Sequence, residues 1–168
     1  MIKEPIKILS DIVQTKLALP SGRVILYDQN FKLPEDDGLF VIVQYVSTDP
    51  YSITTRPIAA PVETREMEEE IVMRTRETYT INIVSRDDTA RIRKEEVLMA
   101  FSSAYASEQQ ELYEFSIARI SNSFVDISEV EGSSKIRRFA INVVVLAWYL
   151  QQNSVDFYDD FSEEILTD

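Results

Sequence analysis

The stretch IVMRTRETYTINIV, residues 71–84, decides the fold, because apolar and polar residues alternate along most of its length. The apolar face is formed by alternate residues, Ile71, Met73, Tyr79, Ile81 and Ile83. The polar face is formed by the residues between them, Arg74, Arg76, Thr78, Thr80 and Asn82. Successive side chains of a strand point to opposite faces of its sheet. The pattern therefore predicts a half-buried strand with one wet face, long enough to extend beyond the sheet.

Two other segments are rich in β-branched and aromatic residues, which favour strands. Residues 39–46, LFVIVQYV, are almost continuously apolar, which indicates a central position in the sheet. Residues 136–150 form the last long strand predicted. Shorter strands are predicted at residues 23–27, 115–120 and 124–127.

Two segments show the helical spacing of apolar residues instead. The first helix is predicted over residues 6–19, with an apolar stripe of Ile6, Leu9, Val13 and Leu17. The second is predicted over residues 89–106, with a stripe of Ala90, Val97, Phe101 and Tyr105. The order helix, strands, helix, strands predicts an α+β fold: a single domain with a mostly antiparallel β-sheet flanked by two helices.

The domain is predicted to span residues 1–150, with an extended arm inside it and a C-terminal tail after it. Residues 47–66 contain Pro50, Pro57 and Pro61, which cannot lie in a central strand, so we expect an extended arm or long loop there, with room for edge-strand stretches. Residues 151–168 mix carboxylates with aromatic residues, a composition typical of a terminus that docks on a neighbouring protein or stays mobile.

Composition excludes several kinds of chemistry. The chain of 168 residues has a formal net charge of -12, with 29 acidic and 17 basic residues. This charge argues against a grip on nucleic acid or on an anionic membrane. Cysteine and histidine are both absent, which rules out disulfides, thiolate metal sites and histidine-based catalysis. Three widely separated glycines cannot form a phosphate-binding loop.

The N-terminal sequence has no long apolar region, so we expect no secretory signal, and no apolar run reaches the length of a membrane span. We predict no catalytic residue, no metal site and no cofactor. The acidic run of residues 66–70 is interpreted as solvated charge that prevents wrong strand pairing, because neighbouring strand residues point to opposite faces and make a poor cation cage. The candidate interface residues are Tyr51, Ile53, Glu66, Glu68, Glu69, Glu70, Arg74, Arg76, Phe157, Tyr158 and Phe161.

Several short stretches together resemble a known family. They are YTINI (79–83), SRD (85–87), KEEV (94–97), SEQQ (107–110), FSIA (115–118) and RRFAI (137–141). The chain is similar over roughly residues 5–150 to the phage neck terminator family, which is related to the tail terminators of long-tailed phages. These stretches are structural motifs and not catalytic ones.

The resemblance implies a non-enzymatic virion protein of the tail or neck, made in the host cytoplasm. Such a protein forms a ring, commonly a hexamer, on the head-proximal end of the tail tube and stops tube growth. Its partners are the tail-tube protein and a head connector, stopper or neck protein, and DNA passes through its lumen without specific binding. No membrane contact is implied.

Other functions remain open at this point. The chain could be a head–tail connector or stopper, or a tail-tube subunit that polymerises into long tubes. A hydrolase that uses carboxylates alone, with or without a divalent ion, is a further alternative. A monomeric adaptor domain is the last. The segments are expected to act as follows: the long strand and residues 47–66 contact other subunits and the tube, Glu66–Glu70 face the lumen or a connector, and Phe157–Phe161 dock on an adjacent protein.

Overall fold

The strand predicted from the alternation of residues 71–84 is the middle strand of the sheet. The structure is a computed structural model, and it describes residues 4–26, 36–58, 67–131 and 134–155. The helices of this part are α1 (Pro5–Lys16), α2 (Thr89–Phe101) and α3 (Ala104–Leu112). Its strands are β1 (Val24–Leu26), β2 (Phe40–Ile58), β3 (Met67–Ser85), β4 (Ser116–Ile120), β5 (Val125–Asp126), β6 (Glu129–Glu131) and β7 (Ser134–Val155). The chain is thus α+β, as predicted.

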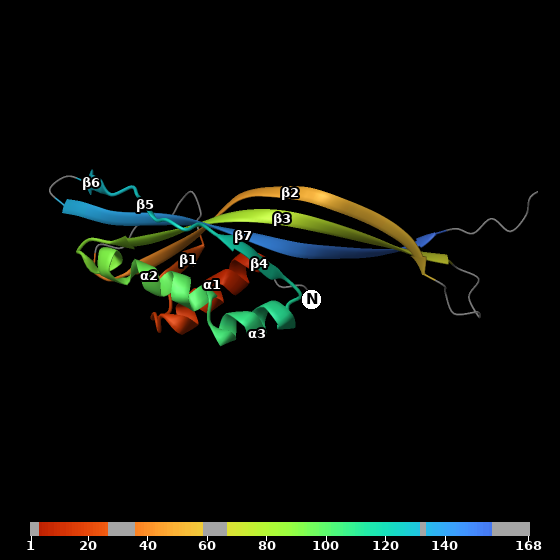
Figure 1. The fold of residues 1–168 in the computed structure, drawn as a ribbon, viewed down its shortest axis with the longest axis horizontal. Helices are drawn as coiled ribbons and strands as arrows, with labels where there is room; N and C mark the ends of the chain where they lie inside the picture. Colours follow the sequence, from red (N-terminus) through yellow and green to blue (C-terminus); the bar gives the residue numbers. More distant parts are fainter. Residues whose placement is uncertain (1–3, 27–35, 59–66, 132–133, 156–168) are drawn as a thin grey trace, which may run out of the picture.

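The sheet has the strand order β1-β2-β3-β7-β4, and β5 and β6 pair with the first part of β7 (Figure 1). Only β1 and β2 run parallel among the described pairs, and the others are antiparallel. β3 pairs with β2 on one side and with β7 on the other over nearly its whole length. The three long strands therefore form the continuous central part of the sheet.

The helices pack on one face of the sheet, which we call the helix face (Figure 1). Alternate residues of β3 and β7, such as Ile81, Ile83 and Val143, are fully buried there. α1 contributes Ile8 and Leu9 to the same core. The period of two in the strands and of 3.6 in the helix brings these apolar side chains together. We call the opposite face of the sheet the open face.

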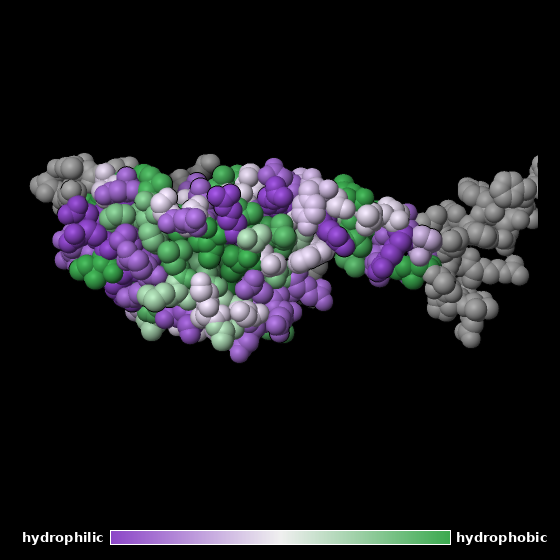
Figure 2. Space-filling view, in the orientation of Figure 1, coloured by the Kyte–Doolittle hydropathy of each residue, from purple (hydrophilic) through white to green (hydrophobic). Residues whose placement is uncertain are grey.

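The three long strands continue past the helices as a β arm, which consists of residues 47–58 of β2, 67–78 of β3 and 144–155 of β7 (Figure 1). Figure 2 shows the arm leading away from the thicker helix-bearing part, with hydrophilic and hydrophobic residues both on its surface. The prediction that the strand of residues 71–84 extends beyond the rest of the sheet is consistent with this shape.

Residues 47–58 form an edge strand in an extended arm, one of the predicted forms, and not a long loop. Pro50 and Pro57 lie in β2, which is an edge strand beyond its short pairing with β1. An edge strand tolerates proline because the missing N–H need not pair with a neighbour. Residues 59–66 of the predicted arm lie outside the described residues.

Three smaller predictions also need correction. The helix predicted over residues 89–106 ends at Phe101, and a third helix, α3, follows it. The Ser103 hydroxyl caps α3 by accepting from the backbone N–H of Ala106. The predicted wet residue Asn82 is buried. β7 continues to Val155, so the first residues of the predicted tail, 151–155, belong to the sheet.

No helix in the described part of the chain has the length and apolarity that crossing a bilayer requires.

Candidate functional site

The two edges of the β arm differ in their ability to pair with another strand. The side of β2 that faces away from β3 has no described partner strand beyond Val43. This edge carries Pro50 and Pro57, and register shifts leave Val46 and Tyr51 as extra, exposed residues. Prolines and bulges are the devices by which sheet edges resist pairing. The β2 edge is therefore protected.

The register explains why both prolines fit. In an antiparallel pair, the backbone groups of two opposed residues point either toward each other or both away. Pro50 lies opposite Thr75, and Pro57 lies opposite Glu69. Thr75 and Glu69 pair with the odd-numbered β7 residues Ala147 and Asn153, and in this register such pairs direct their backbone groups toward each other. The N–H that each proline lacks would therefore point away from the sheet. The β2 edge lacks two of its outward donors.

The opposite edge of the arm is β7 beyond Ala147, and it carries neither proline nor charge up to Val155. The carbonyl of Asn142 accepts from the backbone N–H of Ser121, and that of Arg138 accepts from Ile127, so even-numbered residues of β7 direct their backbone groups away from β3. The pairing of β7 with β3 shows no register shift, so this alternation continues along the arm. Outward backbone groups therefore come from four residues beyond the pairing with β4, Trp148, Leu150, Gln152 and Ser154. This edge is ready to accept a strand.

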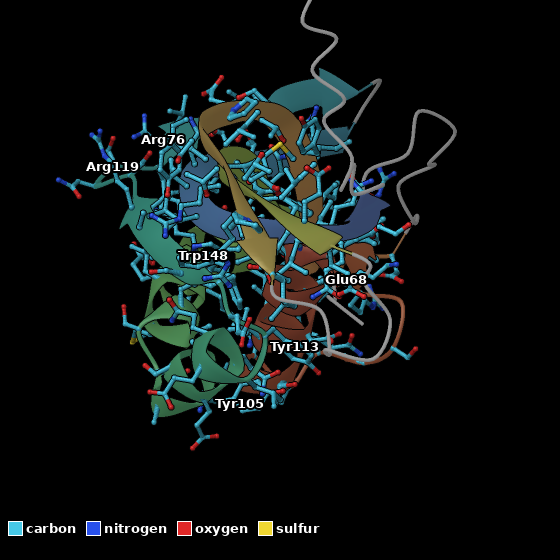
Figure 3. All side chains as sticks on the ribbon, turned by 90° about the vertical axis from the view of Figure 1, so that its right-hand side faces the viewer. Glu68, Arg76, Tyr105, Tyr113, Arg119 and Trp148 are labelled. Atoms are coloured by element: carbon cyan, nitrogen blue, oxygen red, sulfur yellow. The ribbon has the colours of Figure 1, made fainter. Side chains whose placement is uncertain are left out.

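The open face of the sheet carries three exposed arginines where the arm begins, Arg74 and Arg76 of β3 and Arg119 of β4, which we call the arginine patch. Arg76 pairs in register with Leu146 of β7, and Arg119 of β4 pairs with Val144 of the same strand. Figure 3 shows Arg76 and Arg119 extending outward on the same side of the sheet. None of the three forms an ion pair with another described residue.

An apolar groove lies beside the arginine patch, where α3 and the following turn meet the free edge of β7. Its apolar lining consists of Val72, Phe115, Trp148 and Leu150, and its volume is about 420 Å³. Glu111 and Glu114 form its acidic rim. A second, more polar hollow between α1 and α3 is lined by Gln14, Gln109, Tyr105 and Tyr113, the last two labelled in Figure 3.

On the helix face, a buried carboxylate joins the strands at the base of the arm. Glu77 is only 3% exposed and accepts hydrogen bonds from the hydroxyls of Tyr79 and Tyr149. The hydroxyl of Thr75 donates to it at 3.3 Å. Burial, and then the hydrogen bond to Glu77, raise the pKa of the hydroxyls of Tyr79 and Tyr149 well above the ordinary value. Both hydroxyls therefore stay protonated and act as donors.

The acidic run is not uniformly solvated, contrary to the prediction. Glu70 is buried, and it pairs with Arg56, the residue opposite it on β2. Glu68 is exposed, and Glu69 accepts a hydrogen bond from Asn153 of β7 at 3.2 Å. Glu66 lies outside the described residues. The described part of the chain contains no group of three or more acidic side chains arranged to hold a metal ion.

The other predicted interface residues divide into three sets. Tyr51 and Ile53 are exposed on β2, with Ile53 at 65%. Arg74 and Arg76 lie on the open face as predicted. Phe157, Tyr158 and Phe161 lie outside the described residues. Sequence reasoning missed Arg119, Trp148 and Glu77. The alternation of residues 71–84 places Glu77 on the apolar face of its strand, and this pattern alone could have indicated that its carboxylate is buried.

No family model matches this chain, and no curated protein does. The interaction surfaces must therefore be interpreted from their own geometry.

Proposed function

We propose that this chain is a structural subunit that self-assembles through its β arm and closes the head-proximal end of a phage tail tube as a ring. The observation that carries the proposal is the difference between the two edges of the arm. The β7 edge offers backbone hydrogen bonds, whereas the β2 edge is blocked by Pro50 and Pro57 and exposes Tyr51 and Ile53.

Unlike edges favour association through two different surfaces. A contact between two different patches repeats from copy to copy, and it closes into a ring when the rotation between copies allows. An isologous contact would instead stop at a dimer. In the proposed ring, the β7 edge of each subunit receives an extended segment of its neighbour, and the exposed Tyr51 and Ile53 pack against a second neighbour or against the tube.

The resemblance to phage neck terminators adds the biological setting. It suggests a hexamer that joins the tail tube to a head connector or stopper in the virion. Glu68, which is exposed near the end of the arm, is then proposed to face the lumen or the connector. An acidic surface repels the phosphate backbone, so DNA could pass without being held.

Two adjacent glutamines provide a matched pair of variants that test the role of the β7 edge. Gln152→Pro removes an outward backbone N–H, whereas Gln151→Pro removes one that points toward β3. We expect Gln152→Pro to keep its stability and to lose assembly. We expect Gln151→Pro to lower the free energy of unfolding by about 1–3 kcal/mol, because it leaves a ladder hydrogen bond unmade.

The measurement is mass in solution by light scattering, with negative-stain images, in the presence and absence of purified tail tubes. A ring that forms alone or on tubes supports the proposal, and long tubes would indicate a tail-tube subunit instead. A wild-type chain that stays monomeric with tubes would overturn it. Assembly of Gln152→Pro equal to that of the wild type would show that the β7 edge is not the contact.

A further inference from the structure

The arginine patch gathers three positive charges on one face of a strongly acidic protein. The chain carries a net charge of -12, and arginines elsewhere in the described structure, such as Arg91 and Arg93, form ion pairs with nearby carboxylates. Arg74, Arg76 and Arg119 are exposed and form none among the described residues. Like charges on one face repel one another unless a partner supplies negative charge. The patch therefore fits an acidic ligand.

Apolar side chains accompany the arginines on the same face. Leu146 lies in register with Arg76, and Trp148 lies in register with Arg74. Both are half-buried, so each leaves part of its surface open to a ligand. Guanidinium groups stack on aromatic rings as well as pairing with carboxylates. The face is suited to a segment that carries both acidic and aromatic residues.

Two groups of carboxylates limit where such a segment can lie. Asp49 is opposite Arg76 on β2 but forms no ion pair with it among the described contacts. Glu111 and Glu114 rim the groove at the free edge of β7. The carboxylates of such a segment are therefore repelled from the groove and favour the arginines, whereas its aromatic rings can still contact Leu146 and Trp148.

We propose that the arginine patch of one subunit binds the acidic and aromatic segment DFYDDF, residues 156–161, of a second copy of this chain. Asp159 and Asp160 pair with the guanidinium groups, and the rings of Phe157 and Phe161 contact Trp148 and Leu146. The inference rests on the self-assembly proposed above and names a second pair of surfaces for it.

The register indicates that the segment reaches Arg76 and Arg119 of a neighbour and not those of its own chain. Arg74 does not distinguish the two, because its partner Trp148 lies only about 23 Å of strand from Val155. Val155 pairs with Met67, whereas Leu146 pairs with Arg76, so about 30 Å of strand separates the two positions at about 3.3 Å per residue. Phe161 follows Val155 by six residues and extends about 22 Å from it at most. Arg119 is farther still, because its partner on β7 is Val144. The segment of the same chain stops short of both arginines.

A binding experiment tests the inference without requiring a ring. The receptor is the full chain with Phe157 and Phe161 replaced by alanine and Asp159 and Asp160 replaced by asparagine, so that its own segment cannot compete. The probe is a fluorescein-labelled peptide of residues 156–168, and the readout is fluorescence anisotropy at low salt. We expect saturable binding that weakens as salt is added, because the contacts are ionic.

Charge reversals locate the binding site. Arg76→Glu and Arg119→Glu in the receptor should each weaken binding about tenfold or more, because each removes a charge-assisted contact and adds repulsion. Lys16→Glu is the matched control, since Lys16 is also an exposed cation with no described ion pair, and it should bind as the receptor does. Absence of peptide binding, or equal loss in the Lys16 variant, would overturn the inference.

Mixing two full-length variants distinguishes a neighbour's segment from the chain's own. One variant carries Arg76→Glu with Arg119→Glu, and the other carries the four replacements at Phe157, Asp159, Asp160 and Phe161. Each alone should lose the salt-sensitive part of its assembly, and the mixture should recover heterodimers by light scattering. No recovery on mixing would show that the segment binds within its own chain and would overturn the proposal, whereas loss of rings with intact peptide binding would count only against the ring.

Discussion

The buried carboxylate of Glu77 provides a quantitative test of how the arm is attached to the body of the protein. Glu77→Leu removes the charge and leaves the side chain apolar and of similar size. The hydroxyls of Tyr79 and Tyr149 then lose their acceptor. Thr75 loses less, because its hydroxyl also lies 3.4 Å from the carbonyl oxygen of Ala147 and can donate there.

The expected cost follows from the burial of each donor. Tyr79 is 3% exposed, so leaving its hydroxyl unpaired costs about 1–3 kcal/mol. Tyr149 is half-buried and can turn toward water, so its loss is about 1 kcal/mol. The free energy of unfolding should therefore fall by about 2–4 kcal/mol. Removing the buried charge offsets part of this loss, which favours the lower half of the range.

The triple variant Glu77→Leu, Tyr79→Phe, Tyr149→Phe separates this explanation from a simple packing defect. It removes the donors together with the acceptor, and such apolar replacement is close to neutral. We expect urea unfolding to show that the triple variant recovers most of the stability that Glu77→Leu loses. A single variant as stable as the wild type, or a triple variant no better than the single, would refute the reasoning.

Three further predictions concern the same sheet. The pKa of the hydroxyls of Tyr79 and Tyr149 is raised in the folded state, so their contribution to the free energy of unfolding should be fully present below the ordinary tyrosine value of 10.0 and should fall as pH rises above it. Thermal unfolding of the wild type and of the Tyr79→Phe, Tyr149→Phe variant at alkaline pH checks this. An equal loss of stability in both proteins would contradict it. Ile81→Ala should cost about 2–5 kcal/mol in urea unfolding, because Ile81 is fully buried. Replacing Pro50 and Pro57 by valine should restore outward donors on the β2 edge and cause concentration-dependent aggregation, measured by light scattering; a variant as soluble as the wild type would show that these prolines do not protect the edge.

The residues that alternate or follow a helical period made most of the fold predictable. Ile81 and Ile83 indicated the buried face of β3, and Leu9 and Val13 indicated the buried stripe of α1. These patterns depend only on which side of an element meets the core. Local sequence contains that information, because a buried face requires an apolar residue at every second position of a strand and at every third or fourth position of a helix.

The arm was harder to predict, because its strands have no helix layer to cover them. Pro50 and Pro57 gave a valid argument against a central strand, but local sequence does not show which strand lies at an edge. The burial of Glu77 depends on Tyr149, which is distant in sequence, and the burial of Glu70 depends on Arg56 of the neighbouring strand. Their burial follows from the strand register, which single-residue patterns do not determine.

The continuous pairing of β3 with β7 has a consequence for how the molecule folds and frays. Ser85 and Arg137 close the shortest loop in this ladder, and Met67 and Val155 close the longest. Loop closure costs more entropy as the loop lengthens, so the ladder should form first beside the helices and then zip toward the tip of the arm. Opening should proceed in the reverse direction, which gives amide hydrogens near Gln152 faster exchange than those near Ile141. The backbone groups that a neighbour needs would then be the last to become ordered, and a neighbour that binds them would complete the folding of the arm.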